Sequence, residues 1–206
     1  MARVKIGNVF PSDEYLLARC APAGFGLGKT AAQTSNLNTS MNCGWYSFGA
    51  ECANRPFDFG IALVLNRYNA EIVQIAFDVA MENGKNNGAI TLRVYRNSAW
   101  GEWEWVNPPM AAGTEYRTTE RYMGKPVYAK LVDCGGCPGV GTKTVAHNTA
   151  GVVEWILSAQ GQADNGHVFP CKGVDIETSL TDIIIHAEND SMKDTACYVL
   201  LKYTKI

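Results

Sequence analysis

The sequence has little charge: Asp, Glu, Lys and Arg make up 18% of its 206 residues, against about 25% in an average domain. The 18 basic and 20 acidic residues give a formal net charge of −2, so the basic excess typical of proteins that bind nucleic-acid phosphates is missing. No apolar run approaches the ~18 residues that a membrane-spanning helix needs. The residues after Met1 contain no apolar stretch as long as that of a signal peptide. We therefore expect a soluble chain with no nucleic-acid partner and no membrane insertion.

Helical periodicity is also scarce, whereas short apolar or alternating segments are common. In the segment 90–96, for example, Ile90, Leu92 and Val94 alternate with polar residues and share one face. Strands are expected at 61–65, 72–79, 90–96, 126–132, 152–158, 182–187 and 196–205. Because no helical pattern separates them, a sheet of βαβ units is excluded and antiparallel sheets are predicted.

The predicted fold class is mainly β, with two small antiparallel β domains and a short N-terminal helix. Residues 1–36 are expected to hold an edge strand, a helix that Ser12 can cap, and a Gly-rich arm. The segment 21–44 is expected to be an extended loop or a docking arm. Residues 37–109 form the first β domain, and residues 110–206 form a C-terminal β-sandwich. We place the boundary within 107–125, where prolines and glycines surround a polar stretch.

Cysteine and histidine are present without the spacing that metal sites need. Seven cysteines cannot all pair with one another, and without an export signal free thiols are expected. Cys134 and Cys137 form a C-x-x-C motif, but no second ligand pair of similar spacing accompanies it. We interpret this motif as a Gly-rich loop that carries two thiols, and we expect no metal and no cofactor.

Motifs for catalysis are incomplete. Gly28-Lys29-Thr30 ends like a phosphate-binding loop, but Ala23 occupies the position where that motif requires glycine. The G-x-S-x-G motif of hydrolases is missing. Glu102 and Glu104 are expected to share a strand face beside tryptophans, which keeps glycan hydrolysis open as an alternative. The main expectation is a protein that is not an enzyme and has no catalytic residues.

Tryptophans gather in one short segment. Trp100, Trp103 and Trp105 lie within six residues, and such side chains bury large areas while keeping one polar group. Core positions are expected for Trp103 and Trp105, whereas Trp100, beside Gly101, is placed to stack on a sugar ring.

Several short motifs, in their order along the chain, resemble the pyocin-knob module of tail fibres and phage-derived bacteriocins. They are Gly44-Trp45-Tyr46-Ser47-Phe48-Gly49, Asn54-Arg55-Pro56-Phe57, Leu92-Arg93-Val94-Tyr95-Arg96 and Trp100-Gly101-Glu102-Trp103. The segments 6–28, 119–128 and 196–205 are similar to tail proteins of phages and prophages of gut Firmicutes.

The resemblance implies that residues 37–109 are a knob-like module and that the chain is a receptor-binding protein at the tip of a tail fibre. It implies a virion protein assembled in the bacterial cytoplasm, a homotrimer, and partners among other tail fibre or baseplate proteins. The receptor is expected to be a bacterial surface polysaccharide. A structural component without receptor contact and a glycan depolymerase are the two alternatives.

Glycan contacts are expected from Trp100 and from exposed residues of the C-terminal domain, namely Trp155, Asn165, His167 and Asn189. Each has an ordinary alternative. Trp155 lies in an apolar run typical of a core strand, Asn165 precedes Gly166 as in a turn, and Asn189 lies in a polar loop.

Overall fold

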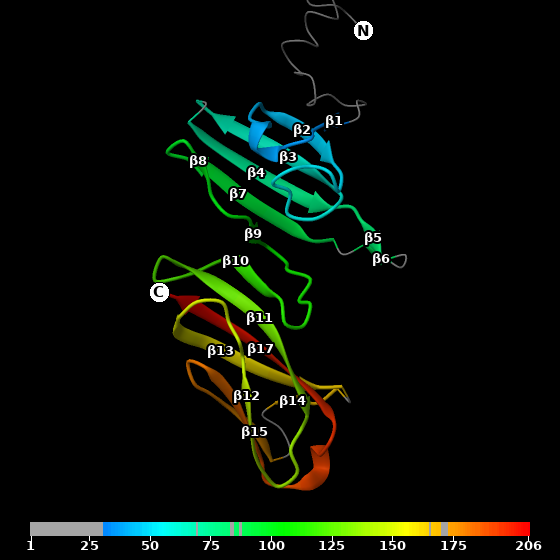
Figure 1. Cartoon of the computed structure of the whole chain (residues 1–206), viewed down its shortest axis with the longest axis vertical. Coiled ribbons are helices and arrows are strands. Elements are labelled where there is room, and N and C mark those ends of the chain that lie inside the picture. The colour runs from blue at the N-terminus through cyan, green and yellow to red at the C-terminus, as the bar shows by residue number, and fades with distance from the viewer. Residues whose placement is uncertain (1–30, 69, 83–84, 87, 165, 170–172) are drawn as a thin grey trace, which may run out of the picture. The chain divides into compact units, whose positions relative to one another are not determined.

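The computed structural model describes residues 31–206 except 69, 83–84, 87, 165 and 170–172. The predicted strand near the N-terminus, the helix after Ser12 and the glycine loop lie outside the described residues. The described chain is mainly β, as the sequence predicts, and its contacts divide it into two compact units between Trp103 and Glu104 (Figure 1). The boundary predicted from the sequence lies at 109–110, a few residues later. No helix in the described part is long and apolar enough to cross a membrane.

The N-terminal unit is built on one sheet. Its strands are β1 (Ala32–Gln33), β2 (Gly44–Phe48), β3 (Gly60–Arg67), β4 (Glu71–Asp78), β7 (Ile90–Arg96) and β8 (Ala99–Trp100), paired in that order. The first pair is parallel and the others are antiparallel. A small hairpin of β5 (Met81–Glu82) and β6 (Lys85–Asn86) lies between β4 and β7 in the chain. The strand predicted at 90–96 is confirmed at both ends.

One face of this sheet is covered by the chain that precedes and follows β2. The short 3-10 helix η1 (Leu37–Thr39) places Leu37 in a core with Phe48, Cys52, Ala62 and Ala76. The Gln74 side chain donates to the carbonyls of Leu37 (2.7 Å) and Ser40 (2.9 Å). The expectation of an extended loop at 21–44 is therefore wrong for its described part, because η1 is fixed to the sheet.

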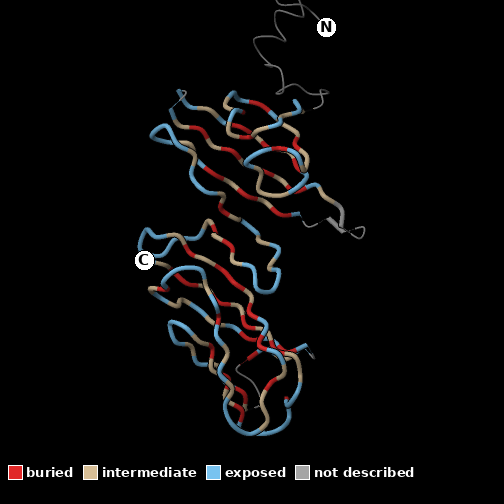
Figure 2. Tube along the Cα trace, in the orientation of Figure 1, coloured by how far each residue is buried: buried red, intermediate tan, exposed pale blue. Residues whose placement is uncertain are grey.

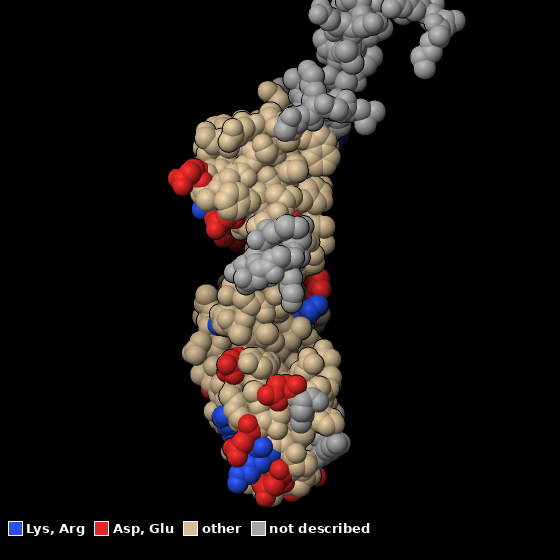
Figure 3. Space-filling view, turned by 90° about the vertical axis from the view of Figure 1, so that its right-hand side faces the viewer, with Lys and Arg blue, Asp and Glu red and all other residues tan. Residues whose placement is uncertain are grey.

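The opposite face of the sheet carries apolar side chains that are partly exposed. The run 61–65, predicted as buried, alternates instead: Ala62 and Val64 are buried, whereas Leu65 is exposed (Figure 2). We call this surface the open face, and it consists of Trp45, Ile61, Leu63, Leu65, Val73, Ile75, Phe77, Ile90, Leu92 and Val94, with Ser47. In the side view, uncharged residues cover most of the visible surface of this unit (Figure 3).

The C-terminal unit contains two sheets. The larger has β9 (Glu104–Trp105), β10 (Glu115–Tyr122), β11 (Lys125–Gly136), β17 (Ala196–Lys205), β13 (Val153–Ala163) and β14 (Val168–Phe169), in that order. The smaller has β12 (Gly141–Ala146), β16 (Asp182–Ala187) and β15 (Val174–Thr178). The short 3-10 helix η2 (Asp190–Met192) precedes β17. Both sheets contribute to one buried core that includes Val132, Val174, Ile183, Ile185, Val199 and Leu201.

The C-x-x-C motif lies on a strand end and not in a loop. Strand β11 continues through Gly136, and both Cys134 and Cys137 are buried in the core. Gly135 has a φ of 65° at a bulge opposite Cys197, a conformation that glycine adopts without strain. Gly135 therefore lets the strand form this bulge without backbone strain. A hydrogen bond between thiols lowers the pKa of Cys134 and raises the pKa of Cys197, which burial raises further.

Candidate binding site on the C-terminal sheet

Strand β17 separates two chemically different faces of the larger sheet. Cys197, Val199, Leu201 and Tyr203 point into the core, so Tyr198 and Leu200 point to the opposite, outer face. Residues paired across antiparallel strands share a face. Gln162 pairs with Tyr198 and Gln160 with Leu200. The outer face therefore mixes amide, phenol and aliphatic groups.

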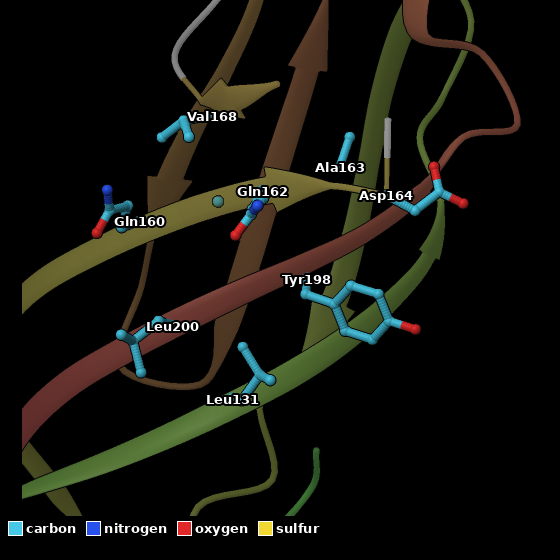
Figure 4. A pocket seen from close by; sticks show the side chains of 9 residues that line it. Leu131, Gln160, Gln162, Ala163, Asp164, Val168, Tyr198 and Leu200 are labelled. Atoms are coloured by element: carbon cyan, nitrogen blue, oxygen red, sulfur yellow. The ribbon is translucent and has the colours of Figure 1, made fainter. Parts of the chain in front are cut away.

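This part of the outer face forms a groove of about 390 Å³, within the usual size range of ligand sites. Figure 4 shows that its side chains come from three neighbouring strands, with Leu131 on β11, Tyr198 and Leu200 on β17, and Gln160 and Gln162 on β13. Asp164, Val168, Gly161 and Ala163 complete the lining. The amides, carboxylate and phenol can exchange hydrogen bonds with hydroxyl groups, and the leucines can contact C–H surfaces.

Gly161 brings two other strands close to the core side of β13, opposite the groove. A Cβ at this position would lie 2.3 Å from side-chain atoms of both Ile176 and Phe169, a separation that packed atoms do not reach. Strand β14 pairs with β13 through Gly161 and Phe169. The same pairing places Val168 at the edge of the groove.

Trp155 lies on the outer face that carries the groove. It pairs with Thr204, which is two residues beyond Lys202 and four beyond Leu200, or about 13 Å along the strand from Leu200. Its side chain is 55% exposed. The alternative of a core position for Trp155 is therefore wrong, because the apolar run is split between the two faces of β13.

The other glycan contacts expected in this unit are His167, Asn189 and Asn165, and the two that the structure describes lie on different segments. His167 lies in the turn between β13 and β14, where its carbonyl accepts from the Ala163 amide at 2.8 Å, next to Val168 of the groove. Asn189 caps η2, since its side chain accepts from the Ser191 amide at 3.0 Å. Asn165 lies outside the described residues.

Trp100 belongs to the N-terminal unit and is held there by its neighbours. Its indole donates to the Asn38 carbonyl at 3.1 Å. The Arg93 guanidinium lies 4.3 Å from the Trp100 ring centroid and 4.4 Å from that of Trp103. Burial lowers the pKa of Arg93 to about 10. Trp103 also packs against the core of this unit.

Glu102 and Glu104 do not share a strand, because Glu102 precedes β9. The Glu104 carboxylate accepts from Arg117 at 3.0 Å and from Arg121 at 2.7 and 2.6 Å. Its charge is therefore balanced within the protein. Among the described residues, no group of three His, Cys, Asp or Glu side chains is arranged to hold a metal ion.

Sequence reasoning missed Gln160, Gln162 and Tyr198 as a group. The available signal was the alternation of polar and small residues from Ser158 to Ala163, which continues the strand predicted to end at 158. The structure extends that strand to Ala163. The pairing of Gln162 with Tyr198 has no local signal, since 36 positions separate the two residues.

No protein-family model and no curated protein matches the sequence. Among solved structures, the chain is similar to an N-truncated R2-type pyocin tail fibre, with 11% identity and a TM-score of 0.31 over 87% of this chain and 100% of that one. It is also similar to the R1 and R2 pyocin fibres of P. aeruginosa, each with 12% identity and a TM-score of 0.32 over 88% of this chain and 69% of the other. Values of this size do not establish a shared fold.

Proposed function

We propose that this chain is a non-enzymatic receptor-binding protein of a phage or prophage tail fibre, which attaches the particle to a bacterial surface glycan. The groove of the C-terminal sheet is the observation that carries the binding part. Sugars present hydroxyl groups together with C–H surfaces, and Gln160, Gln162, Asp164 and Tyr198 stand beside Leu131 and Leu200 there. The tail-fibre setting comes from the sequence resemblance.

Assembly is the second part of the proposal. The protein acts as a homotrimer at the tip of the fibre, with other tail fibre or baseplate proteins as partners, and is part of the virion after assembly in the bacterial cytoplasm. Three copies multiply the effective affinity of a weak site when their receptors are clustered on one cell.

Binding without cleavage fits the carboxylates around the groove better than hydrolysis does. Most glycoside hydrolases use a pair of carboxyl groups on either side of the scissile bond. Among the described residues that line the groove, Asp164 alone carries a carboxylate, and Glu104 is engaged by two arginines. We therefore assign the groove to attachment.

The test compares groove variants with a control on the other sheet. Tyr198→Ala and Gln162→Ala are each expected to weaken retention on bacterial cells or purified surface polysaccharide about tenfold, or ~1.4 kcal/mol. Trp155→Ala and His167→Ala are expected to weaken it less. Thr144→Ala, on the exposed side of β12, is expected to bind like the unmodified chain.

Other outcomes of the same experiments would favour one of the two alternative functions or remove the groove from the proposal. An assembled protein that is retained on no bacterial surface across a panel of strains would point to a structural role. Release of reducing ends from the polysaccharide, stopped by Asp164→Asn, would point to a depolymerase. Equal retention of Tyr198→Ala and Thr144→Ala would remove the groove from the proposal.

A further inference from the structure

Three of the described cysteines meet at one end of the C-terminal core. Cys134, Cys137 and Cys197 belong to the same buried cluster and are 3%, 2% and 0% exposed. They lie near the end of β11, directly after it, and at the second position of β17. Only the first two share a sequence motif, and Cys197, 60 positions after Cys137, joins them through the fold.

The pairing of β11 with β17 brings Cys134 and Cys197 opposite each other. The register shifts at Cys134, which is the extra residue of a bulge that faces Cys197, and both side chains belong to the core. Residues opposite each other in antiparallel strands have Cα atoms about 4.5–5.5 Å apart, and disulfides join Cα atoms separated by about 4.4–6.8 Å. Paired strands therefore already supply the separation that a disulfide between these two residues needs.

The chemistry of the two thiols is also different. The hydrogen bond with Cys197 lowers the pKa of Cys134, and the Lys143 ammonium, which donates to the Gly136 carbonyl at 2.8 Å, acts in the same direction. A thiolate is the form of cysteine that attacks a disulfide. Cys134 is thus placed to act as the nucleophile, with Cys197 beside it as the second thiol.

We propose that Cys134 and Cys197 form a disulfide when the protein leaves the reducing cytoplasm, with a small-molecule disulfide as the oxidant. The Cys134 thiolate attacks one sulfur of the oxidant and releases the other half as a thiolate. The Cys197 sulfur then attacks Cys134 in this mixed disulfide and releases the second half. Two protein thiols are oxidised, one small disulfide is reduced, and the two released thiolates take up the two protons that the cysteines lose. Only the change of compartment rests on the proposed function.

The new bond would close a long loop of the C-terminal unit. The residues between the two cysteines, 135–196, contain all strands from β12 to β16. A cross-link across about 60 residues restricts the unfolded chain strongly and thereby stabilises the folded one. The same bond would join β11 to β17, two of the strands that carry the groove. We therefore expect the oxidised unit to unfold at a higher temperature than the reduced one.

The test exposes the full chain, purified under reducing conditions, to oxidised glutathione. The remaining thiols are then alkylated in denaturant, and linked peptides are identified by mass spectrometry. A link between Cys134 and Cys197 is expected to form over minutes to hours, because both thiols are buried and react only through local opening. The unfolding temperature is expected to rise by at least about 8 °C and to return to its starting value with dithiothreitol.

Two matched variants assign the link, since Cys137 also contacts Cys197 and is buried in the same core. Cys137→Ser is expected to keep the link and the gain in unfolding temperature, whereas Cys134→Ser is expected to lose both. Circular dichroism checks that each variant is folded, and alanine replaces serine at a position where serine unfolds the chain.

Three outcomes would overturn the proposal. They are a pair that stays unlinked in the unmodified chain, a link that uses Cys137, and a link without a gain in unfolding temperature. Retention on cells is measured separately on the reduced protein and read through Tyr198→Ala. Failure of the groove and failure of the disulfide are therefore distinguished.

Discussion

Arg93 is the residue that holds the covered side of the N-terminal sheet together. Its guanidinium contacts the rings of Trp100 and Trp103, and its Nε donates to the Gln74 amide oxygen at 2.9 Å. Gln74 in turn donates to the carbonyl of Leu37 in η1. The planar group thus connects two tryptophans to the segment that covers the sheet, which an ammonium group cannot do.

Arg93→Lys is expected to lower the free energy of unfolding by about 2–4 kcal/mol, because both ring contacts and the hydrogen bond to Gln74 are lost. Denaturant unfolding followed by far-UV circular dichroism measures the change. The control is Arg96→Lys on the same strand, which is exposed and is expected to change stability by less than about 0.5 kcal/mol. Equal effects of the two variants would contradict this role.

At this scale the sequence predicts which residues share a face but not which face is covered. Ile90, Leu92 and Val94 do share one face of β7, yet Thr91 and Arg93 are the buried ones. The covering residue Leu37 lies more than 50 positions before β7, and no local pattern in β7 indicates its contact with the sheet. Trp155 shows the same limit, since its apolar neighbours divide between two faces.

Gly161 sets how closely the elements of the C-terminal unit pack. Gly161→Ala is expected to destabilise the protein by about 1–3 kcal/mol, because the new methyl group would overlap Ile176 and Phe169. The adjacent variant Gln160→Ala, on the outer face, is expected to leave stability within about 0.5 kcal/mol. Thermal unfolding of the two variants checks the difference. A stable Gly161→Ala would show that β14 and β15 can move away from β13.

Elements with a strong local pattern were predicted to the residue, namely 90–96, 182–187 and 196–205. Strand β10 was missed because its C-terminal half is polar and exposed. The end of β11 was interpreted as a loop because Gly135 and Gly136 resemble turn residues. Their actual role is a bulge against β17, about 60 positions later in the chain.

The described chain divides into units with separate cores, and the buried residues of the C-terminal core all lie from Val132 onward, with Tyr128 packed against them. We expect residues 104–206 alone to unfold in one cooperative transition, with an enthalpy of about 70 kcal/mol near 60 °C by calorimetry. The same fragment with Ile185→Asp, a charge at a fully buried position, is expected to show no transition. A fragment that is already unfolded would mean that its core needs the rest of the chain.

The candidate site, too, depends on the fold of the whole C-terminal unit. Most of its residues come from β11, β13 and β17, with Val168 from β14, and the pairing of these strands is a property of the complete sheet. The sequence predicts the two β-strands that flank β17 only in part, and it ends β13 before the two glutamines. A groove formed by distant strands therefore escapes a reading of local motifs.

Strand β17 is the last strand in the chain, yet it lies between β11 and β13 in the middle of the larger sheet. During synthesis, β11 and β13 emerge with the position between them vacant, whereas every strand of the N-terminal sheet precedes Trp103 and can pair first. The larger C-terminal sheet is completed only after the ribosome has delivered residues 196–205. Its contacts span long stretches of chain, which slows folding. The candidate groove, which spans β11, β17 and β13, therefore forms only after the N-terminal sheet has had the chance to pair.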